Sequence, residues 1–278
     1  MFLRLQSYER PAELAEAVRL LGRSEPRTRA LAGGTAVVGP VDDETEVLVD
    51  LSGLGLRHIR PDTQTVRLGA MTTLDDLVRS PEVMFLGGGL VAQAAERTAP
   101  ATMLARATVG GALARPDRAP ELVAALLALD AGVVTVDREL GRTMSSADAV
   151  PAGGLIEEVQ IPATPVVSAF ERLARTPRDL ATVAVYVALH VEDGTCRHLR
   201  LAAAGLGDRP QRLTVAEAAL QAKELSASAI ERAAAAVRES VTPPDDFRGS
   251  AEYRRELAEV LVRRALTAAR DAALQGRK

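Results

Sequence analysis

The stretch ARATVGGALARPDRAPELVAALLALDAGVVTV (residues 105–136) joins a Gly-Gly pair, a Pro- and Arg-rich bend, an apolar helix-like run and a β-branched run. Thr108 stands two residues before the pair Gly110-Gly111. The same device occurs earlier in RALAGGTAVVGP (residues 29–40), where a strand-like segment runs into Gly33-Gly34 and Thr35 follows. One such loop makes a turn, whereas two loops of the same chemistry can hold a ligand between them.

Glycine pairs beside a threonine suit a diphosphate that is bound without a metal. Such a ligand needs several backbone N–H groups pointing inward, and glycine permits both the required dihedral angles and a close approach of the backbone. A threonine hydroxyl adds a further donor. The alternative is a pair of ordinary glycine turns that bind nothing. Because both loops follow predicted strand-rich segments and share their chemistry, the sequence favours a ligand.

Composition excludes several classes of protein. The 278 residues carry 34 Lys and Arg against 37 Asp and Glu, so the formal charge of -3 gives no general attraction to nucleic acid or acidic lipid. The longest apolar run, LVAALLAL, is too short to span a bilayer, and MFLRLQSYERP lacks the apolar core of a signal peptide. Cys196 is the single cysteine and cannot by itself hold an iron–sulfur cluster. We expect a cytoplasmic protein that binds no nucleic acid and is not integral to a membrane.

The pattern of elements predicts two domains and an α+β fold. Residues 1–165 mix strands and helices, including a helix over residues 11–22 that Pro11 opens and Gly22 closes. Residues 166–278 form a hairpin around Asp193-Gly194, followed by Ala-rich helices and a final amphipathic helix. Capping-box spacing marks three helix starts: Thr73 with Asp76, Thr214 with Glu217, and Ser228 with Glu231.

Other chemistry-bearing motifs are missing or incomplete. The sequence contains no G-x-x-x-x-G-K-[ST], no G-x-S-x-G and no complete dinucleotide fingerprint. A two-residue turn at Asp193-Gly194 sets His190 opposite Arg197 and points His198 to the other face, so a zinc site shared by the two histidines is not expected. We expect neither catalytic residues nor metal ligands in this chain.

Taken together, the two loops and the C-terminal segments resemble the FAD-binding (medium) subunit of the molybdenum hydroxylases, the carbon monoxide dehydrogenase and xanthine dehydrogenase family. LAGGTAVV resembles the first flavin loop of that family, and ATVGGALA resembles the second. PELVAALLALDAGV, FERLARTPRDLATVAVYVAL and FRGSAEYRRELAEVLVRRAL are similar to the segments that follow. Each motif is weak alone, but five in the same order cover nearly the whole chain.

The resemblance implies a two-lobed FAD-binding fold of the p-cresol methylhydroxylase type, with the lobes meeting near residues 55–60, and a smaller α+β C-terminal domain. It implies FAD with its diphosphate between the two loops. Glu121 corresponds to an acidic residue directed at the adenosine side, and Arg172 to a basic residue near the isoalloxazine. The loop residues implied to bind FAD are Ala32, Gly33, Gly34, Thr35, Ala36, Thr108, Gly110 and Gly111. Neither loop contains His or Cys, so the FAD is expected to be non-covalent.

The chain departs from the family pattern at polar positions. Ala112 stands where an Asn is common, Leu104-Ala105 where an Arg-Asn pair is common, and Ala36 where Asp or Ser is frequent. Each lost hydrogen bond costs about 1 kcal/mol, so three together cost about two decades of affinity. Because the backbone donors survive such changes, a flavin is still favoured.

The sequence leaves three functions open. The first is an electron-transfer flavoprotein subunit that serves a large molybdenum-cofactor subunit and a small [2Fe–2S] subunit, expected as a dimer of heterotrimers, and passes electrons to NAD, quinone or oxygen. The second is a structural subunit of the same complex that has lost FAD. The third is a free-standing flavin oxidoreductase, which the absence of an acid/base residue in the loops disfavours.

Overall fold

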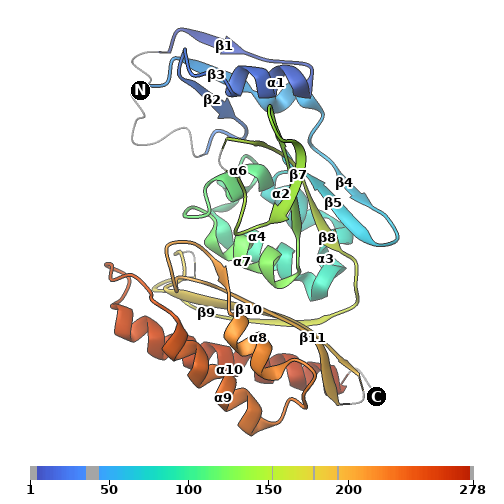
Figure 1. The fold of residues 1–278 in the computed structure, drawn as a ribbon, viewed down its shortest axis with the longest axis vertical. Helices are drawn as coiled ribbons and strands as arrows, with labels where there is room; N and C mark the ends of the chain where they lie inside the picture. The colour runs from blue at the N-terminus through green and yellow to red at the C-terminus, as the bar shows by residue number, and fades with distance from the viewer. Residues whose placement is uncertain (1–4, 36–43, 152, 178, 193, 276–278) are drawn as a thin grey trace.

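The computed structural model describes residues 5–35, 44–151, 153–177, 179–192 and 194–275. Within these residues the strands form three sheets, which follow one another along the long axis of the molecule (Figure 1). Helices pack against each sheet, so the fold is α+β, as predicted.

The first sheet is parallel and small. Its strands, in spatial order, are β1 (Ser7–Glu9), β3 (Val47–Asp50) and β2 (Thr28–Leu31). The crossover helix α1 (Leu14–Leu21) buries Ala17, Val18 and Leu20. The helix predicted over residues 11–22 therefore begins later than expected, at Leu14, and ends as expected near Gly22. A 3-10 turn, η1 (Leu51–Leu54), leads the chain out of this sheet.

The second sheet is antiparallel throughout. Its strands, in spatial order, are β4 (Ile59–Pro61), β5 (Thr65–Gly69), β8 (Leu155–Pro162), β6 (Gly132–Asp137) and β7 (Gly141–Ser146). Between β5 and β6 the chain forms α2 (Leu74–Arg79), α3 (Pro81–Phe85), η2 (Leu86–Gly89), α4 (Leu90–Thr98), α5 (Ala101–Leu104), α6 (Val109–Ala114) and α7 (Pro120–Ala128). The capping box of Thr73 and Asp76 at the start of α2 is confirmed, with both reciprocal hydrogen bonds present.

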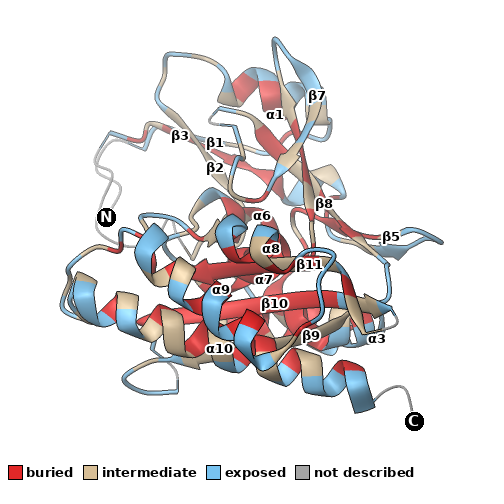
Figure 2. Cartoon of the chain, turned by 60° about the horizontal axis from the view of Figure 1, so that its bottom comes forward, coloured by how far each residue is buried: buried red, intermediate tan, exposed pale blue. Residues whose placement is uncertain are grey.

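The third sheet is sandwiched between two layers of helices (Figure 2). Its strands, in spatial order, are β12 (Gln211–Arg212), β11 (Thr195–Ala204), β10 (Val183–Glu192) and β9 (Val167–Leu173). One face packs on α8 (Thr214–Leu220), α9 (Ala227–Ser240) and α10 (Ala251–Gln275), and the other packs on α7. Along β10, Val185 and Val187 pack with residues of α8, α9 and α10, whereas Ala184 and Tyr186 pack with residues of α7 on the other face. This two-sided burial explains why β10 is almost continuously apolar.

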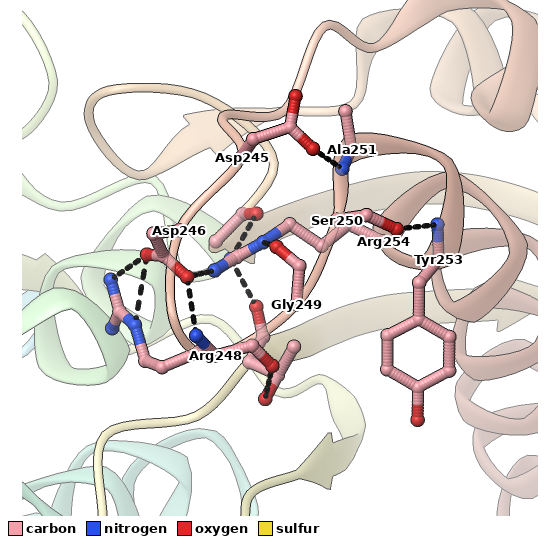
Figure 3. Close-up of polar contacts among 10 residues, drawn as sticks. Asp245, Asp246, Arg248, Gly249, Ser250, Ala251, Tyr253 and Arg254 are labelled. Carbon is pink, nitrogen blue, oxygen red and sulfur yellow. Dashed lines mark hydrogen bonds and ion pairs between the residues drawn. The ribbon is translucent and has the colours of Figure 1, made fainter.

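A fully buried arginine ties the last helix to the third sheet (Figure 3). Arg254 Nη1 donates to the Thr182 carbonyl at 2.7 Å and to the Gly205 carbonyl at 3.0 Å. Its Nη2 donates to the Asp246 carboxylate, which also accepts from Arg248. Burial alone would raise the pKa of Asp246, but the hydrogen bonds from Arg248 and Arg254 lower it to about 2. Since Thr182 precedes β10 and Gly205 follows β11, one side chain fixes both central strands relative to α10.

The two capping boxes predicted in the C-terminal part are wrong. α8 begins at Thr214 without a side-chain cap, because Glu217 accepts a hydrogen bond from the Leu201 N–H at 2.9 Å and so serves the third sheet instead. α9 is capped by Ser226 rather than by Ser228.

The predicted hairpin exists, but its register changes next to His190. Gly194 occupies the turn at φ 79°, whereas Asp193 lies outside the described residues. A bulge next to His190 places this residue opposite His198 rather than opposite Arg197. Directly paired residues share one face of a sheet, so the expectation that the two histidines point to opposite faces is wrong.

Candidate functional site

The first glycine loop follows β2, and its backbone touches the residue that precedes the second loop. A Cβ atom added to Gly33 would lie 1.6 Å from the carbonyl oxygen of Arg106, a contact that no other residue type tolerates. Arg106 Nε also donates to the Gly33 carbonyl at 3.4 Å. Glycine at position 33 therefore allows two segments that lie far apart in the sequence to meet.

The second glycine loop begins α6 and is packed against the end of β5. Thr108 caps the helix, with its hydroxyl accepting a hydrogen bond from the Gly111 N–H at 3.1 Å. The N–H of Gly110 donates to the Ala70 carbonyl at 2.9 Å. A Cβ atom added to Gly110 would lie 2.9 Å from the Ala70 Cβ, so this glycine serves close packing.

The two loops differ in the backbone donors that they offer. The N–H groups of Val109, Gly110 and Gly111 already donate within the protein. In the described part of the chain, the N–H groups of Gly33, Gly34 and Thr35 form no such hydrogen bond. The expectation of inward donors from both loops is thus wrong for these three residues of the second loop, and for the first loop it stays a prediction. Thr108 still offers its own hydroxyl proton, because among the described residues its oxygen accepts from Gly111 and its O–H has no acceptor.

Both loops line one cavity of about 330 Å³, and a second hollow of about 210 Å³ adjoins it. Four residues line both: Thr35, Thr108, Gly111 and Arg115. Away from the loops the larger cavity is lined by apolar side chains: Leu21, Leu51, Met71, Leu155 and Ile156. The smaller is lined mainly by apolar residues too: Leu74, Pro100, Met103, Ala112 and Leu180. The glycine loops therefore stand at the junction of two apolar hollows.

The charge around this junction is positive. Among the described residues that line either cavity, the charged side chains are all arginines: Arg29, Arg115 and Arg118. Arg115 makes a bidentate ion pair with Asp117, with both N···O distances 2.9 Å. Hydrogen bonding from Arg115 lowers the pKa of Asp117, so the pair stays ionised at neutral pH. A junction with this lining suits an anionic group between two apolar ones.

Glu121 and Arg172, both predicted to contact the cofactor, bind each other. Arg172 donates to the two carboxylate oxygens at 3.0 and 2.9 Å, and the Tyr186 hydroxyl donates to Glu121 at 2.9 Å. Burial raises the pKa of Tyr186 well above its ordinary value, and the carboxylate raises it further. The cluster joins α7 to β9 and β10, and neither predicted residue lines the two cavities. Their contact with a cofactor stays a prediction.

The structure brings most of the predicted loop residues together. The larger cavity is lined by Ala32, Gly33, Gly34, Thr35, Thr108, Gly110 and Gly111. Ala36 lies outside the described residues. Sequence reasoning missed Leu155 and Ile156, which open β8, because two adjacent apolar residues at a strand start are also typical of a core. It likewise missed Leu180, which comes from the C-terminal part of the chain.

Groups that could support other chemistry are few in the described residues. These residues contain no group of three or more His, Cys, Asp or Glu side chains placed to hold a metal ion. Burial raises the pKa of Cys196 to about 11, so its thiol stays protonated at neutral pH. No helix in the described ranges is both long and apolar enough to cross a bilayer.

Comparisons with known proteins identify the family to which the chain belongs. The sequence model described as "FAD binding domain in molybdopterin dehydrogenase" matches residues 3–164, and that of the "CO dehydrogenase flavoprotein C-terminal domain" matches residues 168–269. The nicotine 6-hydroxylase medium subunit of Paenarthrobacter nicotinovorans is 32% identical, over 94% of this chain and 96% of the relative. The carbon monoxide dehydrogenase medium chain of Hydrogenophaga pseudoflava is 31% identical, again over 94% and 96%.

Solved structures give the same result for the fold. Carbon monoxide dehydrogenase from Hydrogenophaga pseudoflava superposes with a TM-score of 0.87 and 31% identity, over 97% of this chain and 98% of that one. Quinoline 2-oxidoreductase from Pseudomonas putida 86 superposes with a TM-score of 0.86 and 26% identity, over 98% and 99%. The chain therefore belongs to the FAD-binding medium subunits of the molybdenum hydroxylases and is an oxidoreductase subunit.

Proposed function

We propose that this subunit holds non-covalent FAD across the junction of the two cavities and transfers electrons through it. The observation that carries the proposal is the lining of the junction: two glycine loops and arginine side chains stand between two apolar hollows. FAD has the matching chemistry, because an anionic diphosphate separates its two flat ring systems. A ligand with a single ring system would leave one hollow without a function.

The chain's own residues have separate tasks in this proposal. The N–H groups of Gly33, Gly34 and Thr35 and the hydroxyl of Thr108 are donors for the diphosphate oxygens. The apolar lining of each hollow excludes water from one ring system. When bound, FAD supplies a redox centre that exchanges electrons, and the protein supplies position and electrostatics.

Electron transfer through this chain requires partners, because one cysteine cannot ligate an iron–sulfur cluster. We propose a large subunit with the molybdenum cofactor, which oxidises the substrate, and a small [2Fe–2S] subunit, which delivers the electrons here. Electrons then leave for an external acceptor such as NAD, quinone or oxygen. We propose assembly as a dimer of heterotrimers in the cytoplasm.

The test is purification of the native complex through a tag on this chain. We expect a visible flavin spectrum, one FAD per chain released into the supernatant by acid, and molybdenum and iron in co-purifying subunits. The isolated chain, reconstituted with FAD, should show no reduction of its flavin by organic substrates.

Other outcomes would select the rival functions. A complex without flavin, from a chain that also fails to bind added FAD, would support the structural subunit. Rapid bleaching of the flavin by an organic substrate in the pure single chain would support a free-standing oxidoreductase.

A further inference from the structure

The diphosphate of FAD carries negative charge, yet the loops that face it contribute only neutral donors. Gly33, Gly34, Thr35 and Thr108 offer N–H and O–H groups but no positive charge. A buried or half-buried anion is stabilised most by a charge-assisted hydrogen bond from a guanidinium. A cationic side chain beside the loops that has no other ionic partner would supply this charge.

Most arginines near the junction already have partners. Arg115 is held by both carboxylate oxygens of Asp117, and Arg118 lies 3.7 Å from the same carboxylate. Arg29 also has an interaction partner. Each of these guanidinium groups would have to weaken an existing interaction in order to bind a diphosphate.

Arg106 differs from the other three arginines. Across the described ranges it makes no ion pair, and its one side-chain hydrogen bond is the 3.4 Å contact with the Gly33 carbonyl. The side chain is exposed, and its Nη2 lies 4.0 Å from the point where a Cβ of Gly34 would stand. The guanidinium is thus beside the donors of the first loop and lacks an acidic partner there.

The backbone of Arg106 is fixed while its side chain can move. Its N–H donates to the Met103 carbonyl at 2.9 Å, and its own carbonyl rests against Gly33. A long side chain on a fixed backbone position can reorient by rotamer changes alone. Leaving one long hydrogen bond to a neutral carbonyl costs little compared with breaking a bidentate ion pair.

We infer that Arg106 is the charged ligand of the FAD diphosphate, moving from the Gly33 carbonyl to the phosphate oxygens when the cofactor binds. The inference rests on the proposed function and specifies which positive charge binds the diphosphate. It also assigns a second role to the contact between the two loops, because this contact brings the Arg106 side chain to the first loop.

The test is FAD titration of the apo full-length chain, followed by flavin fluorescence, in wild type, Arg106→Gln and Arg106→Lys. Arg60→Gln is the matched control, since Arg60 is also exposed but lies on β4 and, among the described residues, has no contact with the first loop like that of Arg106 with Gly33. We expect Arg106→Gln to raise the dissociation constants of FAD and ADP about 10- to 100-fold, Arg106→Lys to recover part of the loss, and the control to stay within about twofold.

Salt dependence separates a charge contact from a structural role. The ratio of FAD dissociation constants between Arg106→Gln and wild type should shrink as NaCl rises from about 20 to about 500 mM, because salt screens the lost attraction. A ratio near one at low salt, or a large ratio that salt does not change, would overturn the assignment of Arg106. Failure of the wild-type chain to bind FAD at all would instead overturn the proposed function.

Discussion

The two glycine loops are alike in sequence, but Gly34 in the first and Gly110 in the second are glycines for different physical reasons. In the first loop, Gly34 has φ 79° and an added Cβ would meet nothing closer than 3.8 Å, so the backbone angle is what requires glycine. In the second loop, Gly110 is helical and presses on Ala70. Among the described residues, the N–H groups of Gly33, Gly34 and Thr35 have no backbone acceptor, whereas those of Val109, Gly110 and Gly111 donate to Thr72, Ala70 and the Thr108 hydroxyl.

This difference shows that a Gly-Gly-hydroxyl motif does not by itself identify the anion-binding element. The first loop is half-buried, lines the cavity and, among the described residues, has the N–H groups without a backbone acceptor. The second is the scaffold that holds Thr108 in the same cavity and anchors α6 to the second sheet. Substitutions in the first loop should therefore act mainly on FAD affinity, and those in the second mainly on folding.

The largest effect is expected from Gly110→Val, which should lower the free energy of unfolding by about 3 kcal/mol. A branched side chain must displace Ala70, whose Cβ and carbonyl oxygen would lie 2.9 and 3.0 Å from the new Cβ. Urea unfolding of the apo chain, followed by far-UV circular dichroism, measures this change. Gly110→Ala should cost less, because it adds the Cβ atom without the two further methyl groups of valine.

An unchanged urea midpoint for Gly110→Val would break the comparison, because the second loop would then be as open as the first. Loss of FAD binding by this variant without loss of stability would assign Gly110 directly to the cofactor.

Next in size is Gly33→Ala, which we expect to weaken FAD binding about 100-fold, equivalent to about 2.7 kcal/mol. The new methyl group would meet the Arg106 carbonyl at 1.6 Å, so the two loops must separate and their donors shift. FAD titration of the apo chain gives the affinity. Stability in the absence of FAD should fall less, because the loop is only half-buried and can relax; a collapse of apo stability with normal affinity would contradict this.

Residue spacing predicted helix starts correctly where the capping side chains bind the backbone of their own helix. Asp76 also forms a bidentate ion pair with Arg57, but its carboxylate still accepts a hydrogen bond from the Thr73 N–H, and the capping box forms as predicted. Glu217 has the same spacing from Thr214, but it satisfies a buried N–H of Leu201 instead, since an unpaired buried donor costs more than an uncapped helix end. That competition depends on tertiary contacts and leaves no trace in spacing.

The sequence predicted which residues line the site, but not which of them hydrogen-bond within the protein. Ala32 to Thr35 and Thr108 to Gly111 meet in one cavity, as the repeated motif indicated. The N–H groups of Gly110 and Val109 are taken up by the carbonyls of Ala70 and Thr72, which lie far from either loop in sequence. Glu121 and Arg172 form a buried pair whose two members are 51 residues apart, a match that charge alone cannot identify.

A smaller effect is expected from Thr108→Val, which removes a helix cap and a cavity hydroxyl together. Losing the cap should cost about 1 kcal/mol of stability, and losing the O–H donor about tenfold in FAD affinity. Thr108→Ser keeps both functions and serves as the control. Both quantities come from the same preparations, by urea unfolding and FAD titration. A Val variant that loses stability but keeps wild-type affinity would confine Thr108 to the scaffold.

The smallest effect should come from Gly34→Ala, which tests the backbone angle alone. An alanine at φ 79° is strained by about 1 kcal/mol, but no neighbouring atom opposes its methyl group. Asparagine tolerates this region better, so Gly34→Asn should recover part of the stability in urea unfolding of the apo chain. If Gly34→Ala lowered the stability as much as Gly110→Val, crowding rather than the backbone angle would be the reason for glycine at both positions. Their difference would then lie only in the free N–H groups of the first loop, which the FAD affinities of the two variants would reveal.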